Sequence, residues 1–316
     1  MAMSPPAPAG AGGRGLGSVC AVIGGLGFSF KAGLVKLGYQ WDPTLDAVTL
    51  LTLRMIYSAP FFVVMAWWAG RGASPILPHD WRMLLVLGFV GYYLSSLLDF
   101  IGLQYITAAL ERLTLYLYPT IVILLSAWWF GKPVTRRAVL ALLLSYAGIF
   151  LAFAHDLSIG GDHAAIAFGG GIVFISAILY ASYLVMAGPV IERLGSSRFI
   201  AWAMLASAGF VFAQFALTRP WRALAVPPSI HALSLGMAIF STVLPTWLIA
   251  EAIRRIGASQ SSLVGSLGPI FTIGLGAVIL DEPTHALQLV GAALVLTGVM
   301  LVAAKPRTAP VRAPGL

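Results

Sequence analysis

Ten apolar stretches of about 20 residues follow one another along this chain, and they constrain its fold more than any other feature. A helix needs about 20 predominantly apolar residues to cross the hydrocarbon core of a bilayer. Of the 316 residues, 59% are hydrophobic and 9% are charged, whereas a soluble domain is about 25% charged. We therefore predict an all-α polytopic membrane protein. Its ten transmembrane helices are expected at residues 18–37, 46–69, 82–102, 107–129, 137–154, 167–188, 199–217, 232–252, 258–280 and 286–304.

The chain also contains an internal duplication with an offset of 150 residues. Residues 113–154 match 263–304 at 11 of 42 positions, including Pro119 with Pro269, where composition alone would give roughly a tenth. Five spans per repeat is an odd number, so we expect the second repeat to lie inverted relative to the first. The predicted organisation is a flexible cytoplasmic tail at 1–16, a first repeat at 17–156, a second repeat at 157–304 and a cytoplasmic tail at 305–316.

The basic residues indicate the orientation of the chain. Thirteen Lys and Arg residues lie in the connections and tails on the side of the N-terminus, and three lie on the other side, namely Lys36, Arg219 and Arg222. The positive-inside rule then predicts that both termini are cytoplasmic. The net charge of +8 is spread between apolar runs, which is not typical of a nucleic-acid-binding face. The single cysteine, Cys20, excludes an internal disulfide and a thiolate metal cluster, and we expect it to pack as a small apolar side chain.

Several predicted spans carry polar or aromatic residues on one helical face. In the third span, Tyr92, Ser95, Ser96 and Asp99 fall at i, i+3, i+4 and i+7, which places them on one side of a helix. We expect such stripes to line a hydrated cavity, although interhelical hydrogen bonds of about 0.6 kcal/mol are the alternative for any single serine. The candidate substrate-binding residues are Lys31, Tyr92, Ser95, Ser96, Asp99, Arg112, Tyr116, Pro119, Ser176, Tyr180, Tyr183, Trp247, Ser262, Ser266 and Pro269.

Charged residues inside the spans form two groups. The first repeat places five in the outer half of the membrane, and the second places three at the inner ends of its spans. We interpret them as two ion-pair gates that close alternately, against the alternative of static salt bridges and interfacial anchors. The candidate gating or coupling residues are Arg54, Asp99, Glu111, Glu251, Arg254 and Arg255, with Lys31 and Arg112 completing the outer group.

Two further features leave alternatives open. Pro119, Pro245 and Pro269 lie inside predicted spans, where each removes a backbone donor and either creates a hinge or is a tolerated kink. The segment HDLSIGGDH at 155–163 has metal-ligand side chains. A flexible polar loop explains it better than a metal site, because neither a helical spacing nor a second cluster supports coordination.

Longer motifs resemble a known family. ALERLTLYLYPT leading into a GKP turn, its echo SLVGSLGPIFTIGLGAVILDEPT, and AHDL after the fifth span resemble the EamA-type branch of the drug/metabolite transporter superfamily over residues 17–304. The resemblance implies a carrier for small metabolites in the bacterial inner membrane, often an exporter of amino acids or related solutes. It also implies a central cavity lined by the first, third, fourth, sixth, eighth and ninth spans.

We therefore expect alternating access for a small amphipathic solute, with the aromatic residues stacking on it and Lys31, Arg54 or Arg112 receiving a carboxylate. The alternative is a proton-coupled multidrug or organic-cation exporter, with Asp99 or Glu111 carrying the proton. The expected partners are the solute and the bilayer, and the sequence is compatible with a homodimer. No cofactor, metal or nucleic acid is expected. An intramembrane enzyme is disfavoured because no catalytic or cofactor motif is present, and a non-transporting scaffold would not need buried charges on both sides.

Overall fold

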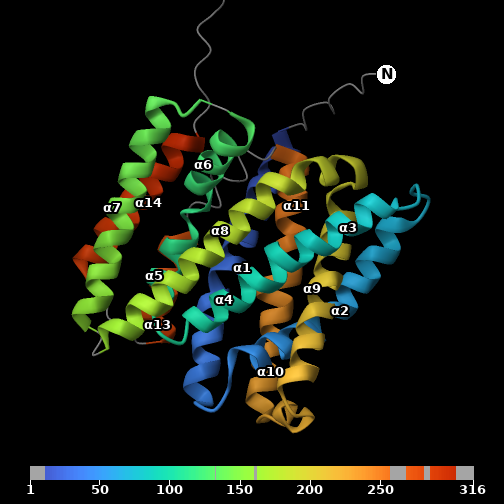
Figure 1. Ribbon diagram of the computed structural model, residues 1–316, viewed down its shortest axis with the longest axis horizontal. Coiled ribbons are helices and arrows are strands. Elements are labelled where there is room, and N and C mark those ends of the chain that lie inside the picture. Colours follow the sequence, from blue (N-terminus) through green and yellow to red (C-terminus); the bar gives the residue numbers. More distant parts are fainter. Residues whose placement is uncertain (1–10, 132, 160–161, 257–267, 281–284, 304–316) are drawn as a thin grey trace, which may run out of the picture.

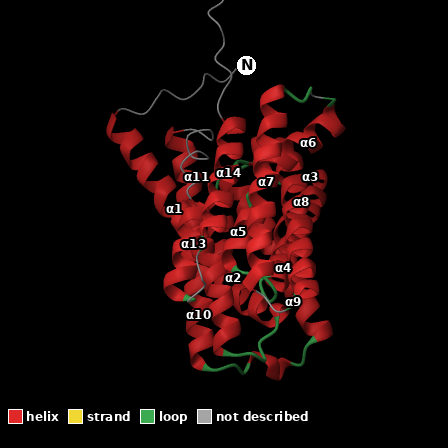
Figure 2. Ribbon diagram, turned by 90° about the vertical axis from the view of Figure 1, so that its left-hand side faces the viewer, coloured by secondary structure: helices red, strands yellow, loops and turns green. Residues whose placement is uncertain are grey.

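A computed structural model describes residues 11–131, 133–159, 162–256, 268–280 and 285–303. Its helices pack side by side as a bundle (Figures 1 and 2). The first half contains α1 (Ala11–Trp41), α2 (Ala47–Gly70), α3 (Pro78–Leu87), the π-helix η1 (Gly88–Leu94), α4 (Ser95–Gly102), α5 (Ala108–Leu115), α6 (Tyr118–Phe130) and α7 (Arg136–Ile159). The second half contains α8 (His163–Leu194), α9 (Ser196–Thr218), the 3-10 helix η2 (Trp221–Leu224), α10 (Pro228–Ala238), the π-helix η3 (Ile239–Val243), α11 (Leu244–Ile256), α13 (Gly268–Ile279) and α14 (Ala286–Ala303).

Eight helical segments in the described part of the chain are long and apolar enough to cross a membrane. They are Gly15–Trp41, Ala47–Gly70, Pro78–Gly102, Ala108–Trp129, Arg136–Ser158, His163–Leu194, Ser196–Thr218 and Pro228–Ile249, and they correspond to the first eight predicted spans. For the ninth, the structure describes 268–280, and for the tenth it shows a shorter apolar helix, Ala286–Leu301. The chain is thus a multi-pass membrane protein, and the regular structure of its described residues is helical throughout. Its first helix begins at Ala11, inside the segment predicted as a tail.

Local sequence explains where several helices begin and end. Asp46 accepts hydrogen bonds from the backbone N–H groups of Val48 and Thr49 at the start of α2, and Thr107 does the same for Leu110 in α5. Such caps satisfy N–H groups that the helix itself leaves free. Gly131, with φ of +62°, adopts the left-handed conformation that closes α6.

The third, fourth and eighth spans are interrupted rather than straight. The π-helix η1 lies within the third span, and η3 lies within the eighth, one repeat of 150 residues further along. The fourth span breaks between α5 and α6, with Pro119 in the first turn of α6. A backbone N–H at that position has no partner within the helix, so proline costs no hydrogen bond there. The proline predicted to kink this span therefore starts a new helix. Matching interruptions in both halves are a structural sign of the duplication.

Helices of the two halves pack in pairs. The main pairs are α1 with α11, α4 with α8, α2 with α9, and α7 with α14. In the last pair, visible at one edge of the bundle in Figure 1, Gly148 lies against the backbone of Gly291, so an added Cβ would overlap it. The outer surface is apolar, with exposed tryptophans such as Trp41, Trp67 and Trp128 near helix ends. That arrangement is typical of a lipid-facing surface with an aromatic belt.

The interpretation of 155–163 as a flexible loop is wrong for its first half. Helix α7 continues to Ile159, and the Asp156 carboxylate lies in the interior, where it accepts hydrogen bonds from the Thr107 N–H and hydroxyl at 2.9–3.0 Å. Asp156 therefore fixes the start of α5. His155 is buried as well and stacks on His285, with ring centroids 5.5 Å apart. Among the described residues, no three His, Cys, Asp or Glu side chains group as metal ligands.

Candidate functional site

A buried ionic cluster joins α1, α4 and α5. Lys31 Nζ lies 2.6 Å from Asp99 Oδ2 and 3.3 Å from Glu111 Oε1. The two carboxylate side chains are 2% and 0% exposed, respectively. Thr107 caps the start of α5 and so fixes the turn of helix that carries Glu111. One ammonium group thus faces two carboxylates away from water, a costly arrangement that needs good geometry to persist.

Two arginines lie beside this cluster and stack on aromatic rings. The Arg54 guanidinium is 4.9 Å from the ring centroid of Phe100, and that of Arg112 is 5.1 Å from the centroid of Tyr116. Arg54 is 4% exposed. The outer group of five charges predicted from the sequence is therefore brought to one region, with three cations against two carboxylates.

Several polar atoms of this group have unused hydrogen-bonding capacity. Arg54 Nε, Arg112 Nε, Asp99 Oδ1 and both oxygens of Glu111 are buried without a hydrogen-bond partner among the described residues. Glu111 Oε1 and Lys31 Nζ, 3.3 Å apart, form an ion pair without the geometry of a hydrogen bond. Buried polar atoms normally find partners, so these atoms are suited to receive water or a polar ligand.

Hydroxyl groups pair across the contact between the two halves of the chain. The Tyr92 and Tyr183 hydroxyls are 2.8 Å apart, and Ser176 Oγ lies 3.2 Å from Ser95 Oγ and donates to the Ser95 carbonyl at 2.8 Å. Gly91 leaves room for the Tyr183 ring, which an added Cβ would overlap. These two serines thus form an interhelical hydrogen bond, the alternative to lining a cavity, because both are buried and bonded to each other.

The tyrosines form a continuous series that ends at Arg112. Tyr183 stacks on Tyr180 with centroids 5.6 Å apart, Tyr180 meets Tyr118 edge-on at 5.5 Å, and Tyr118 lies 6.3 Å from Tyr116. We call Tyr92, Tyr116, Tyr118, Tyr180 and Tyr183 the tyrosine cluster. Such rings attract aromatic and cationic groups through their faces and edges.

Tyr118 was missed by the sequence analysis. In a continuous helix, positions 116 and 118 point to nearly opposite sides. The break between α5 and α6 brings both rings into the cluster. The available signal was the proline at 119, since a helix usually ends just before a proline.

The start of α13 approaches Arg112 closely. A Cβ at Gly268 would lie 2.5 Å from the Tyr116 hydroxyl oxygen and 2.9 Å from Arg112 Nη2. Ser29 in α1 donates to the Gly268 carbonyl at 3.1 Å. Elements of both halves therefore meet at Arg112, and glycine permits the approach.

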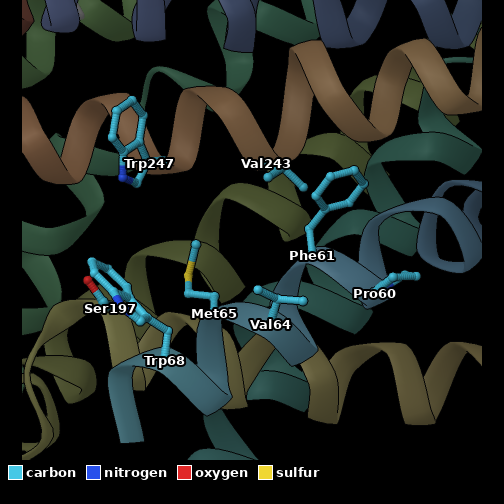
Figure 3. Close-up of a pocket in the computed structure, with 8 residues that line it drawn as sticks. All are labelled: Pro60, Phe61, Val64, Met65, Trp68, Ser197, Val243 and Trp247. Carbon is cyan, nitrogen blue, oxygen red and sulfur yellow. The ribbon is translucent and has the colours of Figure 1, made fainter. Parts of the chain in front are cut away.

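The remaining predicted residues lie elsewhere or outside the description. Ser96 is partly exposed on α4 and Glu251 is partly buried on α11. Trp247, expected with the central stripes, instead lines a pocket of about 440 Å³ with Phe61 and Trp68 of α2 (Figure 3). Ser262 and Ser266 lie outside the described residues, as do the side chains of Arg254, Arg255 and Pro269. The inner gate stays a prediction.

Two ion pairs between the halves were also missed. Arg193 at the end of α8 donates to Asp80 Oδ1 at 2.5 and 3.1 Å, and Arg219 lies 3.1 Å from Asp46. They lie near opposite ends of α9, whose 23 residues span about 34 Å. Burial opposes ionisation of Asp46, but hydrogen bonds from Arg219 and Thr49 outweigh it and hold the pKa of this carboxyl below its ordinary value. From the sequence, these arginines indicated only the orientation of the chain.

Known proteins share this architecture. The model of the EamA-like transporter family matches residues 15–154 and again 167–304. The uncharacterized transporter YcbK of Bacillus subtilis is 30% identical over 290 residues, covering 87% of this chain and 88% of its own. A protein of Streptantibioticus cattleyicolor, named a probable terminal-alkyne amino-acid exporter, is 24% identical over 225 residues, covering 71% of this chain and 73% of its own. One solved crystal structure superimposes with a TM-score of 0.63 at 19% identity, covering 90% of this chain and 95% of that one. With one family model matched in tandem over both halves, this chain belongs to the EamA-like transporter family.

Proposed function

We propose that this transporter exports or exchanges amino acids or related amphipathic solutes across the bacterial inner membrane by alternating access. The observation that carries the proposal is the buried ionic cluster of Lys31, Asp99 and Glu111, which lies beside Arg112 and the tyrosine cluster. A carboxylate of the solute would bind Arg112 or Lys31. Its apolar or aromatic part would stack on the tyrosines.

The proposed mechanism requires ten spans in two inverted repeats with both termini cytoplasmic. The packing supports it. The offset of 150 residues maps α1 onto α8 and α4 onto α11, so the contact of α1 with α11 is the repeat equivalent of the contact of α8 with α4. The unequal distribution of Lys and Arg supports the orientation. In this scheme Lys31, Asp99 and Glu111 close the outer side, and Glu251, Arg254 and Arg255 close the inner side in alternation.

The amino-acid class is supported by charge. The ionic cluster and its two arginines sum to one excess positive charge, which suits an anionic group on the solute. The relative named as a probable terminal-alkyne amino-acid exporter points to the same class.

Transport by purified protein in vesicles tests the proposal. Vesicles loaded with unlabelled solute are exposed in turn to radiolabelled amino acids and organic cations, and counterflow is measured against vesicles without protein. We expect an amino acid to accumulate, and Arg112→Gln to lower its uptake about tenfold or more, the usual cost of losing a charged hydrogen-bonding group. Arg82→Gln, an exposed position on α3, is the matched control. The proposal would be refuted if every amino acid moved no faster than in vesicles without protein.

A proton-coupled exporter of organic cations or drugs is the second candidate. It is favoured by Glu111, a fully buried carboxyl whose two oxygens lack hydrogen-bond partners among the described residues. In this case an inward proton gradient would drive cation efflux, and Glu111→Gln would abolish the pH dependence. Organic-cation efflux that is insensitive to a pH gradient would reject this candidate.

A further inference from the structure

An apolar groove opens on the outer face of the bundle between α2, α9 and α11. It has a volume of about 440 Å³, within the range of about 300–1,000 Å³ typical of small-molecule sites. Side chains of α2 form one wall, with Phe61, Val64 and Trp68, and Val243 and Trp247 face them from the other (Figure 3). The walls carry few polar groups, namely the Ser197 hydroxyl and the indole N–H groups of Trp68 and Trp247.

The groove faces the lipid rather than water. Val64, Trp68 and Trp247 are 63%, 67% and 53% exposed, and they lie on the membrane-crossing segments Ala47–Gly70 and Pro228–Ile249. From Pro60 to Trp68 the α2 wall runs about 12 Å along the helix axis, which makes the site elongated. In a bilayer, the molecules that surround such a surface are acyl chains.

Positive charge lies at the end of the groove where α2 finishes. Arg71 directly follows α2, is exposed, and stacks on Trp67 with its guanidinium 4.4 Å from the ring centroid. Arg198, next to Ser197, donates to the Ser74 carbonyl at 2.7 Å and so holds the 71–77 connection against α9. Basic residues at the end of a membrane helix attract the phosphates of anionic lipids.

We propose that this groove binds one acyl chain of an anionic phospholipid, whose phosphate is bound by Arg71 and Arg198. The apolar walls select the chain, and the two guanidinium groups select the headgroup. A polar cargo would find one hydroxyl and two indole N–H groups along these walls and no charged side chain, so the groove suits a lipid better than the transported solute. This site is separate from the ionic cluster, and its existence does not depend on the proposed transport.

Native mass spectrometry of the full-length protein in detergent tests the site. Phosphatidylglycerol or phosphatidylcholine with identical acyl chains is titrated in, and retained lipid per chain is counted. We expect wild type to prefer phosphatidylglycerol. Val64→Trp, which fills the groove, should remove about one bound lipid of either kind, whereas Val63→Trp, a neighbouring exposed position outside the lining, should retain it.

The headgroup contact has its own variants. Arg71→Gln should weaken phosphatidylglycerol binding about fivefold, since one interfacial arginine contributes roughly that much. It should weaken phosphatidylcholine binding less, because the choline cation offsets the charge of the phosphate. Arg82→Gln is the control for loss of a basic residue elsewhere. Equal lipid retention by Val64→Trp and Val63→Trp would overturn the proposal, as would a change of oligomeric state in Val64→Trp without loss of lipid, which would make the groove an interface between copies. Neither outcome requires transport, so failure here is distinct from failure of the proposed function.

Discussion

Lys31 is the residue on which the ionic cluster depends. It contacts Asp99 and Glu111, which lie 68 and 80 positions away along the chain, at 2.6 and 3.3 Å. Two buried carboxylates side by side repel each other unless a cation lies between them. From the sequence, all three were expected in the outer half of the membrane, but the pairing itself is a tertiary contact.

Removing Lys31 tests this dependence. We expect Lys31→Met to lower the free energy of unfolding by about 3–5 kcal/mol, because it leaves two buried carboxylates without their cation. The triple variant Lys31→Met/Asp99→Asn/Glu111→Gln should recover part of that stability, since neither carboxylate is then left unpaired, although the buried Arg54 loses the counter-charge of Asp99. Thermal unfolding followed by circular dichroism measures both. A triple variant as unstable as the single one would contradict the ionic explanation.

The Asp46–Arg219 pair predicts a dependence on pH. The pKa of Asp46 is lower in the folded protein than in the unfolded chain, so its stabilising contribution is complete above the unfolded pKa of about 3.9 and is lost as the pH falls through the folded value. Because both side chains are about one-third exposed, we expect Asp46→Asn to cost about 0.5–1 kcal/mol at neutral pH.

Unfolding midpoints of wild type and Asp46→Asn, compared from about pH 7 to about pH 3, measure this contribution. The difference between them should shrink toward the acidic end. A difference that stays constant with pH would mean that the carboxylate charge does not contribute.

At the scale of elements, close helix contact is decided by small residues. Gly148 in α7 lies against Gly291 in α14, and Gly298 lies against Ser145. A side chain at any of these glycines would push the helices apart, because their backbones already touch. The duplication pairs Gly148 with Gly298, but which helix each one contacts is decided by the fold.

Gly148→Ala should therefore destabilise the α7–α14 pair. A Cβ there would overlap the Gly291 carbonyl and come within 2.9 Å of the Val295 nitrogen, and we expect a loss of about 1–3 kcal/mol for such overpacking. Gly171→Ala in α8, where a Cβ meets nothing within 4 Å, is the matched control and should cost nothing. Unfolding midpoints of both variants check the expectation; equal midpoints would show that the contact tolerates expansion.

At the scale of the whole molecule, the connections of the two halves cluster by side. Thr44, from the connection before α2, lines a small pocket together with Arg222 and Ala225 from the connection before α10. Ser74, from the connection between α2 and α3, is held instead against Arg198. In an inverted duplication, equivalent connections of the two repeats emerge on opposite sides of the membrane.

Cysteine accessibility tests this arrangement. In a Cys20→Ser background, we expect an impermeant thiol reagent added outside intact cells to label Thr44→Cys and Ala225→Cys, and to label Ser74→Cys only after the membrane is permeabilised. Cys20 itself is buried, so its replacement removes background without disturbing a surface. Labelling of Ser74→Cys and Ala225→Cys from one side would exclude the inverted repeat.

Composition and periodicity by themselves determined that this chain crosses the membrane many times, where most spans lie, that its halves are related, and which family it resembles. These properties depend on local composition or on repetition along the chain, so they can be inferred without knowing which helices contact each other. The tertiary structure decided which side chains meet: Lys31 with Asp99 and Glu111, Tyr118 in the tyrosine cluster, and Trp247 with the α2 side chains of the groove. A helical period shows which face of a helix is polar, but the neighbour across that face depends on how the helices break and pack.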